Sequence, residues 1–335
     1  MNIDLSTSYM GLKLKNPLII SSSRITGNLE AIKQCESYGA SAIVLKSIFE
    51  EQMVLQSEAR LKNGKESEAY YWFPEAKEVV VNLSKEEQLE KYIRFVKTVK
   101  ENTEIPVISS IHCMSAEGWP KFAHEIEAAG ADALELNISI FPFNNSMNSL
   151  QIENLYVDIL KKVKKEVSIP VSIKLGHFFT NICSIVSRLV ENGIDGLVLF
   201  NRYFRPDIDI DSLKVVADEQ FSSPDEASLP LRWIALMKGN HLNCDLVAST
   251  GIHFYTGVVK QLLVGAQAVQ LCSTLYQNGI PYIAELLKGL KEWMQQHHFE
   301  KIDDFRGKSL DYQTAEASFE RIQYMKRDFE RYNKY

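Results

Sequence analysis

The sequence predicts an α/β protein: a (β/α)₈ TIM barrel with extended loops at its C-terminal face. A glycine followed by a short apolar segment occurs four times along the chain, and a proline precedes three further apolar segments. Amphipathic patterns, such as Leu29, Ile32 and Cys35, or Phe122, Ile126 and Ala129, lie between the apolar segments. This alternation is typical of parallel strands joined by covering helices.

The four glycines predict where helices end and strands begin. A glycine just past a helix adopts the left-handed conformation that ends it, and the apolar residues that follow suit a strand buried on both faces. The glycines are Gly39, Gly130, Gly193 and Gly265. They precede expected strands at residues 43–46, 134–137, 197–201 and 269–273.

The prolines predict further strands, because a proline at the first position of a strand loses no ladder hydrogen bond. Pro17, Pro106 and Pro170 precede residues 18–22, 107–111 and 171–174, and residues 245–250 form one more apolar segment. Eight parallel strands alternating with helices favour a closed barrel of about 250 residues. A doubly wound open sheet is the structural alternative.

Length and composition divide the chain into a barrel over residues 1–310 and a helical tail over 311–335. In the tail, an apolar stripe falls on one helical face and would pack on the barrel or on a partner subunit. Its members are Phe319, Ile322, Met325, Phe329 and Tyr332. Residues 50–104 and 202–231 exceed what the repeat needs, and we expect them to act as lids, to cap the barrel or to contact another subunit.

The composition excludes several classes of function. The formal charge of −6 and the lack of a basic run argue against a nucleic-acid partner. The five cysteines show no ligand or disulfide spacing, so we expect reduced thiols and no metal. No export signal or long apolar segment occurs, which predicts a cytoplasmic protein without a membrane anchor.

Polar residues end the predicted strands, where barrel enzymes place their active sites. Buried polar groups need partners, and a polar organic cofactor would supply them. These strand-end positions are Ser22, Lys46, residues 110–112, Asn137, Lys174, Asn201, Thr250-Gly251 and Ser273. The segments ending in Gly251 and Ser273 follow the seventh and eighth strands, where barrels commonly bind phosphate.

The two lysines suggest two kinds of chemistry. A cation near the pyrimidine edge of a flavin stabilises the charge that develops on reduction. A desolvated lysine can also act as a Schiff-base nucleophile, as in a lyase or aldolase acting on a phosphorylated substrate. A non-catalytic flavoprotein is a third possibility.

Short motifs resemble the FMN-dependent dihydroorotate dehydrogenase family over about residues 3–310. The motifs are Asn16-Pro17-Leu18, Leu45-Lys46-Ser47, Glu135-Leu136-Asn137, Ile173-Lys174-Leu175 and Gln270-Leu271-Cys272-Ser273. The resemblance implies an FMN-binding barrel that oxidises dihydroorotate to orotate in pyrimidine biosynthesis. It also implies a cytoplasmic homodimer like the class 1 members.

The resemblance assigns roles residue by residue. Lys46 and Lys174 match lysines that contact the flavin, and Ser21 and Ser22 match residues that border it. Gly251, Cys272 and Ser273, with Thr250, match the phosphate cradle. Asn137 and Asn201 match asparagines that bind the flavin or a small planar anionic substrate.

One departure concerns the catalytic base. The family places a Cys or Ser three residues after the asparagine of the fourth strand, and here that position holds Ile140. Ser139 is one residue short, and successive strand residues point to opposite faces. Ser139 remains a candidate catalytic residue, and His112 and His177 are alternative bases. The resemblance therefore predicts a divergent member with an altered substrate, and Arg202 and Arg205 suggest that this substrate is anionic.

Overall fold

The computed structural model describes residues 3–49, 74–113, 119–138, 140, 146–203, 206–217, 221–239, 242 and 244–309. Ser139, Arg205, residues 50–73 and the predicted tail helix lie outside the described residues. The predictions made for them therefore stay predictions.

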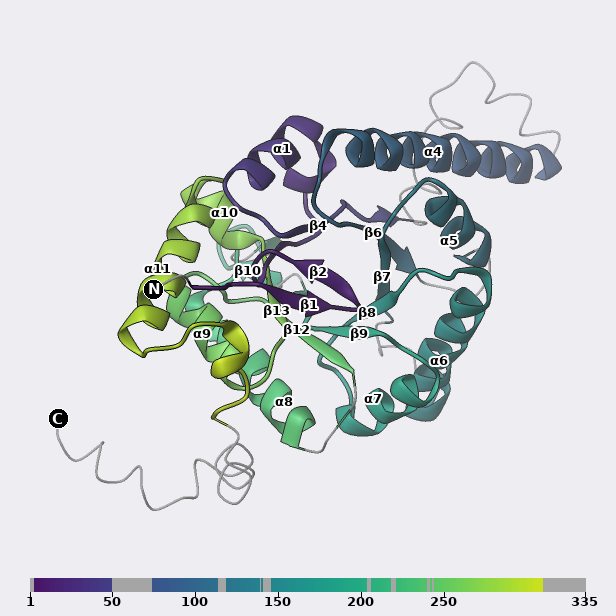
Figure 1. Cartoon of the computed structure of the whole chain (residues 1–335). Helices are drawn as coiled ribbons and strands as arrows, with labels where there is room; N and C mark the ends of the chain where they lie inside the picture. The colour runs from purple at the N-terminus through teal and green to yellow at the C-terminus, as the bar shows by residue number, and fades with distance from the viewer. Residues whose placement is uncertain are drawn as a thin grey trace.

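Eight parallel strands form a closed barrel surrounded by helices (Figure 1). The chain of pairings runs from β3 through β4, β6, β7, β8, β9, β12 and β13 and returns to β3. The strands are β3 (Leu18–Ile20), β4 (Ala42–Val44), β6 (Val107–Cys113), β7 (Ala133–Ile138), β8 (Val171–Leu175), β9 (Gly196–Leu199), β12 (Asp245–Ser249) and β13 (Ala268–Leu271). This closure confirms the predicted barrel and excludes the open sheet.

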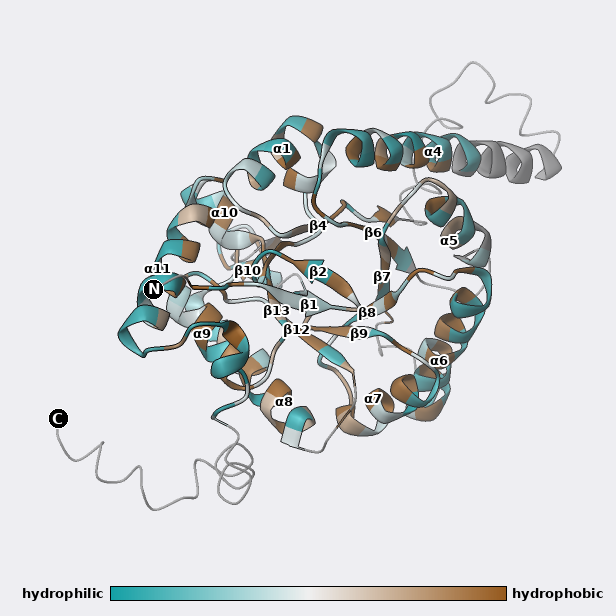
Figure 2. Cartoon of the chain, viewed as in Figure 1, coloured by the Kyte–Doolittle hydropathy of each residue, from teal (hydrophilic) through white to brown (hydrophobic). Residues whose placement is uncertain are grey.

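The helices cover the barrel with apolar faces. In α7 the buried positions Ile182, Ile185, Val186 and Leu189 recur at helical spacing. Figure 2 shows hydrophobic and hydrophilic residues alternating around the helices in this way. The helices are α1 (Leu29–Ser37), α4 (Pro74–Asn102), α5 (Trp119–Ala128), α6 (Ser149–Glu166), α7 (Ile182–Glu191), α8 (Ser228–Gly239), α9 (Tyr255–Leu263), α10 (Ser273–Asn278) and α11 (Tyr282–Gln296). None of the described helices is long and apolar enough to cross a membrane.

An antiparallel hairpin of β1 (Thr7–Tyr9) and β2 (Leu12–Leu14) closes one end of the barrel (Figure 1). The backbone N–H of Met10 donates to Asp245 at the start of β12, so this is the N-terminal end of the strands. The ring of Tyr9 is fully buried against Gly196, where an added Cβ would lie 2.7 Å from the ring. A ligand site must therefore open at the opposite end.

The two long stretches have different structures. Residues 74–102 form α4, whose buried Leu89, Val96 and Val99 belong to the core. This part is a helix of the barrel repeat and not a lid. In the second stretch, β10 (Pro206–Asp209) and β11 (Lys214–Ala217) form an exposed antiparallel hairpin, followed by the 3₁₀ helix η2 (Pro224–Ala227).

Candidate functional site

A cavity of about 210 Å³ lies at the C-terminal ends of the strands. All predicted cofactor residues except Lys46 and Asn137 line it: Ser21, Ser22, Lys174, Asn201, Thr250, Gly251, Cys272 and Ser273. Arg202, Ser222, Ser249, Ile252 and Gln270 complete the lining. The structure thus brings together residues from the first, fifth, sixth, seventh and eighth barrel strands and the loops after them.

Lys174 is a buried cation in this cavity. It belongs to β8, every residue of which is buried, and its side chain lies among hydrogen-bond acceptors. Its Nζ donates to Ser21 Oγ at 3.0 Å and to Gln270 Oε1 at 2.9 Å. A buried ammonium needs such partners because it has lost its hydration. The cavity therefore has a positive charge at a defined position.

The hydrogen bonds of Lys174 continue into the barrel interior. Ser21 Oγ donates to Gln270 Oε1 at 3.1 Å, and Gln270 Nε2 donates to Glu135 Oε2. Burial raises the pKa of Glu135, while the nearby Lys174 charge and the Gln270 hydrogen bond oppose that rise. Sequence reasoning assigned no role to Glu135 or Gln270. The alternation of β7, which puts Glu135 on the same face as Asn137, is the signal that could have found the first of them.

The two lysines that were predicted together lie in different surroundings. The side chain of Lys46 is exposed and lies beside Gly27, where an added Cβ would be 3.2 Å from its Cδ. Ser47, the next residue, forms hydrogen bonds with Ser22 Oγ at 3.0 Å and Ser110 Oγ at 2.7 Å. Lys46 is therefore at the rim of the barrel, whereas Lys174 is inside the cavity.

The two predicted asparagines contact each other. Asn201 Nδ2 donates to Asn137 Oδ1 at 3.1 Å, which joins the second residue after β9 to the end of β7. Asn137 is not part of the cavity lining, but its partner is. The pair can present amide donors and acceptors to a planar ligand.

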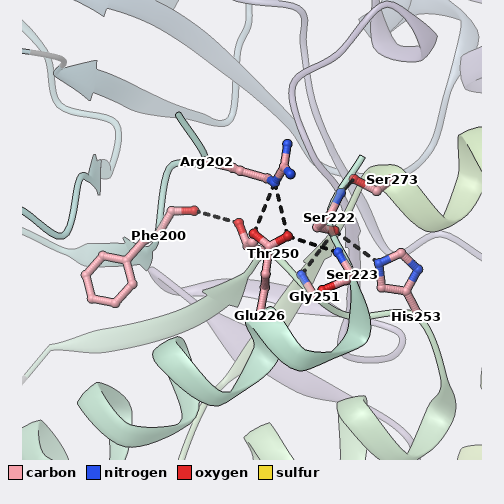
Figure 3. Close-up of polar contacts among 9 residues, drawn as sticks. All are labelled: Phe200, Arg202, Ser222, Ser223, Glu226, Thr250, Gly251, His253 and Ser273. Carbon is pink, nitrogen blue, oxygen red and sulfur yellow. Dashed lines mark hydrogen bonds and ion pairs between the residues drawn. The ribbon is translucent and has the colours of Figure 1, made fainter. Parts of the chain in front are cut away.

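One end of the cavity consists of hydroxyl and backbone N–H groups (Figure 3). Ser222 N donates to Ser273 Oγ at 3.0 Å, and Gly251 N donates to Ser222 Oγ at 3.3 Å. Gly251 has φ +79°, and an added Cβ would lie 2.2 Å from the backbone N of Ala227. Ser222 also contacts His253, and neither residue was predicted, because both lie in loops without a strand-end pattern. This end suits an anion such as phosphate.

Arg202 forms an ion pair at the wall of the cavity. Its Nε lies 3.1 Å from Glu226 Oε2, and Glu226 Oε1 accepts from Ser223 N at 3.0 Å (Figure 3). The side chains of Arg202 and Glu226 are only 17% and 13% exposed. The aspartates of the β10–β11 hairpin, Asp207, Asp209 and Asp211, are exposed to solvent and do not take part in this ion pair.

A second cavity of about 520 Å³ adjoins the first and shares Asn201, Arg202, Ser249 and Thr250 with it. Its lining includes the rings of His177, Phe178, Phe200 and Tyr203. The ring centroids of His177 and Phe178 lie 4.1 Å apart, with the ring planes tilted by 37°. His177 therefore lines a neighbouring space and not the first cavity. His112 is buried at the end of β6 and is not among the residues that line either cavity.

Ile140 does not line the first cavity. It lines a small cavity of about 50 Å³ with Tyr156, Phe179 and Tyr203, among others. None of the residues around this small cavity also lines the 210 Å³ cavity. The position that matches the family's base is therefore apolar and packed against α6 and the loop after β8.

These features define a (β/α)₈ barrel with a polar cavity at the end where enzymes of this fold bind their ligands. The sequence profile of the family described as "Dihydroorotate dehydrogenase" matches residues 4–294, and the chain belongs to this family.

Individual relatives are distant but match over most of the chain. Several are named "Dihydroorotate dehydrogenase B (NAD(+)), catalytic subunit". The one from Thermoplasma volcanium is 28% identical over 92% of this chain and 99% of its own length, and the one from Methanocaldococcus jannaschii is 29% identical over 86% and 94%. The chloroplastic "Dihydropyrimidine dehydrogenase (NADP(+))" of Arabidopsis thaliana is 25% identical over 93% and 78%. All three relatives are dehydrogenases by name.

Proposed function

We propose that the protein is an FMN-dependent oxidoreductase of the dihydroorotate dehydrogenase type, acting on a CH–CH bond of a small planar anionic substrate. The observation that carries the proposal is the buried ammonium of Lys174 in the 210 Å³ cavity. Its hydrogen-bond partners there, Ser21 and Gln270, are neutral. The positive charge is therefore available to a ligand that gains negative charge during reaction.

The donors in the cavity fit the two polar ends of FMN. The hydroxyls of Ser222 and Ser273 and the backbone at Gly251 can hold a phosphate, with no Cβ between Gly251 and the backbone of Ala227. Lys174 suits the pyrimidine edge of the ring system. When bound, FMN supplies the acceptor for a hydride.

The other predicted residues take supporting roles. Ser21 and Ser22 border the ring, and Thr250 and Cys272 complete the phosphate end. Lys46 does not line the cavity, and we propose that its exposed side chain contacts the ligand from the rim. Asn137 and Asn201 orient the substrate through amide hydrogen bonds, and their mutual contact holds both side chains in place.

The substrate is proposed to differ from dihydroorotate. Removing a proton from carbon requires a base, and general-base catalysis contributes about 10²- to 10⁴-fold. Ile140 has no group that accepts a proton. Ser139, His112 and His177 are the candidate bases from sequence, and His177 lines the cavity that adjoins the first one. Arg202 lines both cavities and can pair with an anionic substrate.

The remaining sequence-based assignments are also proposals. We propose that residues 1–310 form the FMN barrel, that residues 311–335 form a helical tail, and that the protein is a cytoplasmic homodimer. Several of the relatives are named as catalytic subunits, which makes assembly with another chain a second arrangement to test. Size-exclusion chromatography with light scattering would separate a monomer from a homodimer.

The deciding experiment is to purify the protein and test it for bound flavin. We expect a yellow protein that releases FMN on denaturation, or a colourless one that regains visible flavin absorbance when FMN is added. Failure of both would contradict the proposal. Borohydride trapping of a substrate on a lysine would instead support the Schiff-base lyase, although Lys174 would first have to leave its contacts with Ser21 and Gln270.

A further inference from the structure

Glu135 is a carboxyl group in the interior of the barrel. It lies on β7 in register with Ser110 of β6 and Ser172 of β8, and only 1% of its surface is exposed. Barrel interiors are ordinarily filled by branched apolar side chains, since a buried carboxylate is costly unless it is paired and hydrogen-bonded. A packing role alone does not explain a carboxyl group at this position.

The contact between Glu135 and Gln270 determines which way the Gln270 amide faces. An amide has two donors on nitrogen and acceptors only on oxygen. Because Nε2 donates to Glu135, Oε1 faces the opposite way and accepts from Lys174 at 2.9 Å and Ser21 at 3.1 Å. A reversed amide would direct its N–H groups at the Lys174 ammonium and its oxygen at the carboxyl group. Both contacts would then be unfavourable.

We propose that Glu135 is a positioning residue that acts through Gln270 to hold the Lys174 ammonium in the cavity, and that it thereby sets the reduction potential of FMN bound there. The inference rests on the proposed function. Glu135 does not line the cavity, so its effect on a ligand must pass through Gln270 and Lys174.

The groups around Glu135 support this role. Lys174 is the cation whose charge acts on it, and Tyr9 and Tyr92 face it from the N-terminal hairpin and from α4. Burial raises the pKa of Tyr92 to about 12 and that of Tyr9 well above its usual value, so both phenols are neutral near pH 7. Glu135 Oε1 accepts no hydrogen bond from the described residues. Gln270 is thus the hydrogen-bonded link between the carboxyl group and the cavity.

The test compares two neutral replacements of similar size. Glu135→Gln keeps an oxygen that can accept a hydrogen bond from Gln270, whereas Glu135→Leu does not. The two variants therefore differ in this hydrogen bond and not in the charge at position 135. We expect FMN bound to the Leu variant to have the lower midpoint potential. A tenfold change in the oxidised-to-reduced ratio corresponds to about 30 mV for a two-electron couple, and we expect at least that shift by dye-equilibration titration.

Gln270→Met removes the link itself and should lower the potential in the same direction. In that background, Glu135→Gln and Glu135→Leu should give equal potentials, because the path to Lys174 is already broken. Ser172→Ala is the matched control, since its hydroxyl donates to Leu134 O in the same layer of the barrel and not to the Glu135–Gln270 pair. We expect no shift in this control.

A second measurement does not need FMN. The rate at which an amine-reactive reagent labels Lys174 in cofactor-free protein, followed by mass spectrometry, should rise about tenfold in Glu135→Leu and in Gln270→Met, but not in Glu135→Gln. Equal potentials and equal labelling in Glu135→Gln and Glu135→Leu would overturn the inference. So would a difference between them that persists in the Gln270→Met background. Protein that labels as expected but binds no FMN would refute the proposed function and the effect on potential, while leaving the positioning of Lys174 supported.

Discussion

Ser222 Oγ lies 3.1 Å from His253 Nε2, and both side chains are buried. The contact joins the segment before η2 to the loop after β12, at the end of the cavity that we propose holds phosphate (Figure 3). Burial lowers the pKa of His253 below its ordinary value of 6.5, although Ser222, Gln277 and Glu226 act in the opposite direction. The neutral imidazole is therefore the form that the folded protein favours.

This shift predicts how stability depends on pH. At pH values between the lowered pKa of His253 in the folded protein and its value of 6.5 in the unfolded chain, His253 binds more protons in the unfolded chain than in the folded protein. The free energy of unfolding should therefore decrease as the pH falls from about 6.5 through the folded pKa. His253→Asn should lack this component in urea titrations at a series of pH values. His297→Asn, at an exposed position, is the control and should keep the pH dependence of the wild type. If His253→Asn also keeps the wild-type pH dependence, the prediction is wrong.

Gly251 and Gly193 provide a matched pair of substitutions. Both have positive φ, +79° and +81°, but an added Cβ meets the Ala227 backbone at 2.2 Å in the first and nothing within 4 Å in the second. Gly193→Ala should destabilise the protein by about 1–2 kcal/mol from backbone strain alone. Gly251→Ala should cost about 1–3 kcal/mol more from the steric clash and should weaken FMN binding. If urea denaturation shows equal losses of unfolding free energy in Gly251→Ala and Gly193→Ala, the close approach of Gly251 to the Ala227 backbone is not required for stability.

The position of Ile140 predicts that restoring a base there does not restore dihydroorotate oxidation. Ile140 lines a small cavity that shares no residue with the 210 Å³ cavity. Ile140→Cys should therefore raise the rate of anaerobic flavin reduction by dihydroorotate less than about tenfold, well below the 10²- to 10⁴-fold of a working base. Ile152→Cys, in the same small cavity, is the control. A hundredfold gain specific to position 140 would show that dihydroorotate is the natural substrate.

The ion pair between Arg202 and Glu226 predicts that a variant with both residues replaced is more stable than the variant with Arg202 alone replaced. Both side chains are largely buried, so Arg202→Met leaves a carboxylate without this cation and should cost about 2–3 kcal/mol. Adding Glu226→Gln removes the charge but keeps an oxygen for Ser223 N, and should recover about 1 kcal/mol. Urea denaturation of the wild type, both single variants and the double variant measures this coupling. A double variant less stable than Arg202→Met would refute it.

The barrel could be predicted from sequence because its signals are local. A glycine such as Gly130 ends one helix, and a proline such as Pro170 begins one strand, whatever the rest of the chain does. The N-terminal hairpin gave no such signal, since its fit depends on Tyr9 meeting Gly196, almost two hundred residues later. The helical nature of residues 74–102 was also missed, because charged residues dominate that stretch and its buried side, with Val96 and Val99, is narrow.

The same division holds for the candidate site. The sequence predicts its polar strand-end residues, such as Lys174 and Ser273, because a polar group at the end of an apolar strand must face the mouth of a closed barrel. The sequence alone therefore determined the architecture and most of the cavity lining. The tertiary structure alone decided the contacts of Lys174 with Ser21 and Gln270, the exposure of Lys46 and the pairing of Arg202 with Glu226. Hydrogen bonds and ion pairs depend on distances of a few ångströms between residues far apart in the chain, and those distances exist only after the barrel has closed.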